Sequence, residues 1–130
     1  MVIAALAAAL GACNDDAGSP KELCSVLGDG RSFTSLFEQG FDPTDPQRAL
    51  TQLEAASVDL DQLHTAAPSE VRDDLEQEAA YIDAVIRVLR QEDPDDPAAV
   101  VAAINALSAE REAAEVASLE LRAFEEAHCR

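Results

Sequence analysis

Residues 69–91 read SEVRDDLEQEAAYIDAVIRVLRQ, and this stretch decides the fold. Its apolar residues recur every three or four positions, the spacing that places side chains on one face of an α-helix. The main stripe consists of Val71, Leu75, Ala79, Ile82, Ile86 and Leu89, widened by Val85. The pattern predicts a long amphipathic helix from about Ser69 to Gln91 that buries one face against other helices.

The preceding stretch carries a second stripe of the same period. Asp45 is placed to cap a helix whose first residue is Pro46, since proline at that position needs no amide donor. Ala67-Pro68 ends this helix. Its apolar face consists of Leu50, Leu53, Ala56, Leu60 and Leu63. The short connection to the helix at 69–91 favours antiparallel neighbours.

Nearer the N-terminus, residues 19–22 (SPKE) combine a capping serine, a proline at the first helical position and a glutamate at the third. We expect a first helix here, broken by the glycines of residues 28–30 (GDG). A second short helical segment opens at Ser32 and stops at Gly40. The apolar residues of these two segments are Leu23, Val26, Leu27, Phe33, Leu36 and Phe37.

In the C-terminal part, residues 93–97 (DPDDP) repeat the pattern of residues 42–46 (DPTDP). The match fits a duplicated hairpin, but two similar helix starts explain it more simply. The helix after residue 97 carries Val100, Val101, Ile104 and Leu107.

Ser108 is placed to cap the last helix. The pattern leaves open whether a kink or a continuous helix joins Leu107 to Glu110. The last helix carries Val116, Leu119, Ala123, Phe124 and Ala127 and ends near Cys129.

These elements predict an all-α domain, an up-and-down bundle of four to five helices. No segment shows the β-branched alternation between turn residues that is typical of a strand. Abundant alanine implies closely spaced helix axes, and such an interior leaves little volume for a buried group. We therefore expect no cofactor.

The chain of 130 residues carries a formal charge of −17, from 26 acidic and 9 basic residues. This charge would repel a phosphate backbone, which argues against nucleic-acid binding. The chain also lacks the runs of Lys and Arg that draw a helix onto anionic lipid. Hydrophobic residues make up 48% of the sequence, so we expect a folded domain rather than disorder.

Membrane attachment is predicted instead by the N-terminus. Residues 2–10 (VIAALAAAL) form an uncharged apolar run of signal-peptide length, far short of the ~20 residues that a spanning helix needs. Residues 10–13 (LGAC) then resemble the lipobox of bacterial lipoproteins. The resemblance implies cleavage after residue 12 and a diacylglycerol on the Cys13 thiol.

This interpretation divides the chain into a signal peptide (1–12), a lipidated cysteine with a flexible linker (13–19) and a helical bundle domain (20–130). The linker is polar, acidic and contains glycine. A normal signal peptide carries a positively charged residue before its apolar run. No Lys or Arg precedes the run here, so we expect the true translation start to lie upstream. The alternative is an apolar N-terminal helix that packs in the domain core.

The chain has three cysteines. With Cys13 lipidated, Cys24 and Cys129 remain as a pair in an oxidising compartment. A disulfide between them would fasten the first helix to the last and, in the chain-entropy model, would stabilise the fold by about 4 to 5 kcal/mol. The alternative is two unrelated buried thiols.

Two carboxylate-x-x-histidine pairs, Asp61 with His64 and Glu125 with His128, match the motif with which ferritin-like bundles bind two metals. Such a site also needs two further glutamates and a position near the middle of the bundle. Both histidines instead lie in the last turn of their helices, where attraction to the helix dipole explains them better. We therefore expect no metal site.

Catalytic groupings are equally weak. Cys129 lies next to His128, but a disulfide is the simpler role for this cysteine. The adjacent acids at 73–74 and 125–126 point apart on a helix and are expected on a solvated face. The acidic loops lack the ligand spacing of a calcium loop. We expect no catalytic residues and therefore no enzyme.

Residues 41–56 (FDPTDPQRALTQLEAA), 66–80 (AAPSEVRDDLEQEAA) and 124–129 (FEEAHC) carry a further resemblance. From Cys24 to Cys129 the chain resembles small, secreted helical proteins of high-GC Gram-positive (actinobacterial) type, most of them of unknown function. The resemblance implies a fold and a location, but it assigns no activity and no functional residues.

We therefore expect a monomeric lipoprotein on the extracytoplasmic face of the cell membrane, held there only through its lipid. Its expected role is a non-enzymatic interaction or structural module that contacts another envelope protein or a cell-wall component. The alternative is a carrier or sensor of a small molecule or metal ion, bound between helices or on the acidic loops.

Overall fold

A computed structural model describes residues 17–28, 32–33, 41–42 and 44–130. The regular structure of these residues is entirely helical, which confirms the predicted fold class. The helices are α1 (Pro20–Leu27), α3 (Pro46–Ala66), α4 (Ser69–Gln91), α5 (Pro97–Asn105) and α6 (Ser108–His128). The expected helical segment opening at Ser32 falls, apart from its first two residues, outside the described residues.

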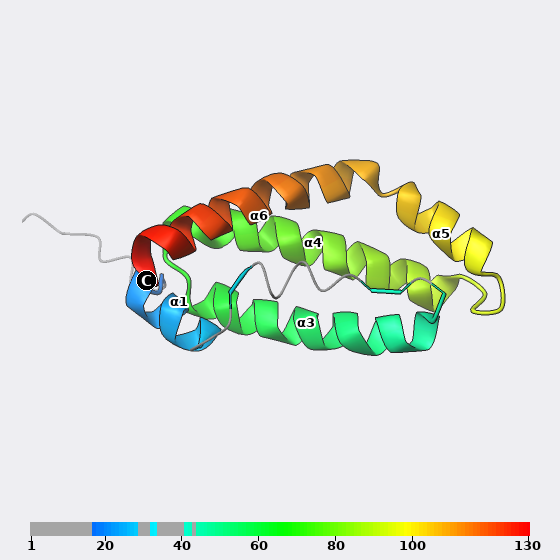
Figure 1. Cartoon of the computed structure of the whole chain (residues 1–130), viewed down its shortest axis with the longest axis horizontal. Helices are drawn as coiled ribbons and strands as arrows, with labels where there is room; N and C mark the ends of the chain where they lie inside the picture. Colours follow the sequence, from blue (N-terminus) through cyan, green and yellow to red (C-terminus); the bar gives the residue numbers. More distant parts are fainter. Residues whose placement is uncertain (1–16, 29–31, 34–40, 43) are drawn as a thin grey trace, which may run out of the picture.

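Helix α4 is the centre of the bundle. It packs against α3 on one side and α6 on the other, and the three long helices run alternately up and down (Figure 1). Helix α1 contacts α3 and α6 at one end, whereas α5 contacts α4 at the opposite end. The predicted up-and-down topology is confirmed.

The core consists of two clusters. Burying a Leu, Ile, Val or Phe side chain contributes roughly 1.5–3 kcal/mol, so these clusters supply most of the driving force for folding. The larger cluster, toward the α1 end, contains Leu23, Leu27, Phe33, Leu60, Leu63, Ala67, Val71, Leu75, Ile82, Ile86, Leu121 and Phe124. The smaller cluster, toward the α5 end, contains Ala49, Val85, Leu89, Val100 and Ile104.

Three helices begin with a side-chain cap. The capping oxygen accepts a hydrogen bond from the amide three residues later, at 3.1 Å for Ser19, 3.2 Å for Asp45 and 3.1 Å for Asp96. Asp45 and Asp96 also share nearly the same backbone conformation, with φ/ψ of −121°/78° and −117°/78°. Both copies of the DPxDP pattern therefore start a helix with the same cap geometry.

The junction between α5 and α6 is a kink. The amide of Leu107 donates to the carbonyl oxygen of Ile104 at 3.0 Å, and the Leu107 carbonyl oxygen accepts from Arg111 at 3.0 Å, so α6 starts at once. Ser108 is the first helical residue rather than the expected cap, and its side chain caps nothing. The half-buried Leu107 packs on the smaller cluster. This packing, rather than a capping side chain, fixes the turn between α5 and α6.

The expected apolar stripe of α6 is wrong in all but one residue. Phe124 is buried, but the other four expected members, Val116, Leu119, Ala123 and Ala127, are exposed. The buried face consists of Ala114, Ala117, Ser118, Leu121, Phe124 and Glu125. Both stripes have helical spacing, and the bundle uses the one whose small residues let α6 approach α4 closely.

Candidate functional site

A disulfide between Cys24 and Cys129 ties α1 to the end of α6, as predicted. The two residues are 105 positions apart in sequence, and their Cα atoms are 5.4 Å apart. The amide of Cys129 also donates to the carbonyl oxygen of Glu125 at 2.8 Å, which terminates α6. Cys13, the predicted lipidation site, lies outside the described residues.

The start of the described chain lies at this same end. The amide of Gly18 donates to the carbonyl oxygen of Ala67, in the turn between α3 and α4, at 3.0 Å. A Cβ at position 18 would overlap the carbonyl oxygen of Ala66, so only glycine fits this close approach. Gly18 and the capping residue Ser19, the last two residues of the expected linker, are thus held on the domain.

The two predicted carboxylate-histidine motifs are not brought together. His64 pairs with Glu76 of α4, with Nε2 to Oε1 at 3.0 Å, and His128 lies 3.9 Å from Glu70 of α4. Each histidine thus faces a glutamate of the neighbouring helix. Within the described residues, no group of three or more His, Cys, Asp or Glu side chains is placed to hold a metal ion.

Glu125 is buried in the core rather than exposed on the expected solvated face. Its Oε2 accepts a hydrogen bond from the amide of Phe33 at 2.9 Å. Its position follows from helix geometry, because residue 125 lies one turn after Leu121 on the core-facing stripe. The amide supplies the polar partner that a buried carboxylate requires.

The seam between α4 and α6 holds a second buried acid. Glu78 is 5% exposed, and burial raises its pKa to about 7, an increase that the positive charge of Arg122 opposes. Burial also raises the pKa of Asp74, one turn earlier, and the negative charges of Glu120 and Asp73 raise it further. Each of these two carboxyl groups would therefore be stabilised either by binding a proton or by a positive charge placed beside it.

A shallow groove of about 460 Å³ opens along this seam. Alanine side chains of α6 form its floor, and Val116 together with acidic and amide side chains borders it. Its lining residues are Asp74, Gln77, Ala109, Glu112, Ala113, Val116 and Ala117. We call these residues the α4–α6 groove.

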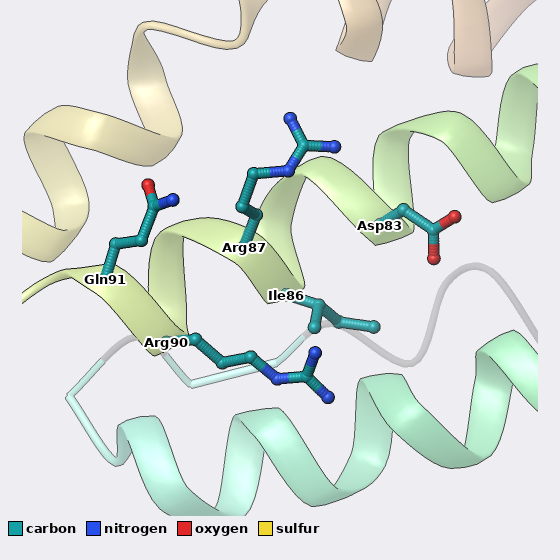
Figure 2. A pocket seen from close by; sticks show the side chains of 5 residues that line it. All are labelled: Asp83, Ile86, Arg87, Arg90 and Gln91. Carbon is teal, nitrogen blue, oxygen red and sulfur yellow. The ribbon is translucent and has the colours of Figure 1, made fainter.

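A second hollow, of about 340 Å³, lies near the C-terminal end of α4 (Figure 2). Ile86 lies between two arginines, of which Arg90 extends along α3 while Arg87 points away from it. Arg90 is paired with Glu54 of α3 at 2.6 Å. Arg87 forms no ion pair with another described residue, and Asp83, one turn earlier on α4, lines the same hollow (Figure 2).

The sequence contained a signal for Glu78 that the apolar pattern concealed. Positions 71, 75, 78, 82, 85 and 89 alternate spacings of four and three, the heptad rhythm of a helix packed between neighbours. Glu78 occupies a core position of that rhythm, whereas the expected stripe used Ala79, which is only partly buried. A strict heptad count would have found this acid.

None of the helices within the described ranges has both the length and the apolar character needed to cross a bilayer. Compared with models of known protein families, with curated proteins and with solved structures, the chain shows no significant match.

Proposed function

We propose that this chain is a membrane-anchored lipoprotein on the extracytoplasmic face of the cell, where it acts as a non-enzymatic interaction module. The proposal combines the lipobox-like residues 10–13 with a domain closed by a disulfide, a bond typical of oxidising compartments.

The position of the chain's entry into the domain is the observation that carries the proposal. Gly18 binds the α3–α4 turn, and α1 and Cys129 lie at the same end of the bundle (Figure 1). The 23 residues of α4 span about 35 Å, at 1.5 Å per residue. A tether at Cys13 would therefore hold one end near the membrane and present the α5 end and the long helix faces to other molecules.

Intact mass spectrometry of the protein extracted from membranes tests the anchor. The expected species lacks residues 1–12, carries a diacylglycerol on Cys13 and has lost two hydrogens to the Cys24–Cys129 disulfide. Cys13→Ala should leave the precursor uncleaved and without lipid, while the disulfide stays intact. An unmodified chain that begins at Met1 and is recovered from the soluble fraction would contradict the proposal.

Crosslinking in intact cells tests the interaction role. A photoreactive side chain placed on the exposed faces of α4, α5 and α6 should capture an envelope protein or a cell-wall fragment from cells carrying the wild-type anchor. Cys13→Ala serves as the control, because it removes the anchor without touching these faces. Repeated capture of nothing from any of the three helices would count against an interaction module.

The hollow beside Ile86 favours a second candidate function, a carrier or sensor of a small anion. Its volume of about 340 Å³ suits a small ligand, and Arg87 has the planar donors that bind carboxylate or phosphate. Thermal-shift measurements with inorganic phosphate and with citrate, on the wild type and on Arg87→Gln, test it. A stabilisation that Arg87→Gln abolishes would support this function, and the absence of any shift would dismiss it.

A further inference from the structure

The outer face of α6 exposes two large apolar side chains. Val116 is 57% exposed and Leu119 is 60% exposed, although both stand within a helix whose opposite face is packed on α4. Val116 also lines the α4–α6 groove, so this apolar surface is continuous with the groove floor. We call Val116, Leu119 and the α4–α6 groove together the α6 face.

The floor of the groove suits an incoming helix. It is formed by Ala109, Ala113 and Ala117, whose small side chains allow another backbone to approach closely. These alanines lie four residues apart and so form one continuous row along α6. A helical segment with apolar side chains on one face could pack into this row, with Val116 and Leu119 along one side of the contact.

The charges around the groove determine what kind of helix fits. Asp74 and Glu112 line the groove, and Glu120 adds negative charge near Asp74, whereas Glu115 lies 4.0 Å from Arg111 of the same helix. Asp74 forms no ion pair with another described residue, and its pKa is raised by burial and then by the negative charges of Glu120 and Asp73. A positive side chain placed here would relieve that repulsion.

Resting on the interaction role proposed above, we propose that the α6 face binds a cationic amphipathic helix of a partner protein, with its apolar side in the α4–α6 groove and its Lys or Arg side chains against Asp74 and Glu112. A second copy of this chain does not meet the same requirement, because pairing would bring two acidic rims together in a chain of net charge −17. Anionic lipid headgroups are repelled for the same reason.

Binding of a designed peptide to the purified, oxidised full chain tests this assignment. The probe is a labelled amphipathic peptide of about 15 residues, long enough to form a helix, with Leu and Ala on one face and Lys on both flanks. Fluorescence anisotropy should show saturable binding that weakens at least tenfold between about 50 and about 300 mM salt, as expected for exposed charge pairs. A peptide with Glu in place of Lys should not bind.

Two matched pairs of variants locate the binding surface. Val116→Ser with Leu119→Ser, which adds no charge, should weaken binding at least tenfold, whereas Val58→Ser on α3 should not, although Val58 is 56% exposed, like Val116. Asp74→Asn with Glu112→Gln should weaken binding about tenfold, and the charge-matched pair Asp61→Asn with Asp95→Asn should not. Circular dichroism should show that all of these variants remain folded, because every substituted side chain is at least partly exposed.

Several outcomes would overturn the assignment. These are binding of the Glu peptide, equal weakening by Val58→Ser, or no binding at all. A concentration-dependent dimer in sedimentation that Val116→Ser with Leu119→Ser abolishes would assign the face to a second copy. Binding that appears only after residues 1–12 are removed would assign the groove to the chain's own apolar segment.

The two proposals can fail separately. An acylated chain that captures a partner through α3 or α5 but ignores the Lys peptide would refute the α6 assignment and leave the proposed function standing. A chain that binds the peptide through the α6 face but carries no lipid would refute the lipoprotein proposal alone.

Discussion

The side chain of Glu125 accepts a hydrogen bond from the backbone amide of Phe33 at 2.9 Å, across 92 residues of sequence. Both partners are buried: Phe33 is completely inaccessible, and Glu125 is 7% exposed. The bond therefore anchors Phe33 to α6 within the larger core cluster, one turn before the disulfide at Cys129.

Replacing Glu125 with Ala should destabilise the protein by about 2–3 kcal/mol, because the buried amide of Phe33 would lose the carboxylate that accepts its hydrogen bond. Glu125→Gln should cost less than about 1 kcal/mol, since its amide oxygen can still accept the bond. Urea denaturation followed by circular dichroism measures both. Glu126→Ala is the control on the exposed neighbouring residue, and an equal loss there would contradict the role given to Glu125.

Opening the disulfide should have a larger effect. Cys24→Ser with Cys129→Ser releases a loop of 105 residues and should lower the free energy of unfolding by about 4 kcal/mol, mainly by enlarging the unfolded ensemble. Denaturation with and without reductant gives the same comparison in the wild type. Cys13→Ser should leave stability unchanged, and a comparable loss in that variant would mean that Cys13 takes part in the fold.

Glu78 should make stability depend on pH in a defined window. Burial raises its pKa from 4.5 to about 7, so between these values the folded state keeps a proton that the unfolded state has released. The contribution of Glu78 to the free energy of unfolding should therefore be greatest below pH 4.5, fall as the pH rises to about 7, and then level off.

Glu78→Gln should reduce that pH dependence, because the amide is neutral in both states. The variant should match the wild type at pH 4 and exceed it at pH 8, as measured by thermal unfolding across this range. Glu110→Gln, at an exposed position of α6, should leave the pH profile unchanged. A wild-type profile that Glu78→Gln leaves unchanged would show that Glu78 is solvated.

Replacing Gly18 with any larger residue should destabilise the protein. In Gly18→Ala the new Cβ overlaps the carbonyl oxygen of Ala66, so residue 18 must move and lose its hydrogen bond to Ala67. We expect a loss of about 1–2 kcal/mol, in the range of a single hydrogen bond with some strain. Ser25→Ala, at an exposed position of α1, is the control, and unchanged stability of both variants would show that the chain is free at residue 18.

The fold could be predicted from the sequence because its signals are local. The stripes of α3 and α4, the capping residues and the proline at the first helical position each depend on near neighbours alone. The pairing of Cys24 with Cys129 followed from the prediction that Cys13 carries a lipid, which leaves two of the three cysteines to pair. These features gave the order of the described helices and the closure of the bundle by the disulfide.

The hydrogen bond of Glu125 and the face of α6 could not be predicted in the same way. The buried carboxylate of Glu125 is satisfied by an amide 92 residues away, and no local pattern reports such a partner. In α6, two stripes of similar spacing compete, and residue hydrophobicity favours the one with Val116 and Leu119. Packing reversed that preference, because close approach to α4 depends on small residues rather than on the most apolar ones.

Two leucines of α6 provide the sharpest test of this register. Leu121 is fully buried in the larger core cluster, whereas Leu119 is 60% exposed two residues earlier. Leu121→Ala should therefore cost about 2–5 kcal/mol through lost burial and a cavity, and Leu119→Ala should change stability by less than about 0.5 kcal/mol. Urea denaturation of the two variants decides between the faces: because the residues lie about 200° apart around the helix, a large loss from Leu119→Ala would mean that α6 packs with its opposite side inward.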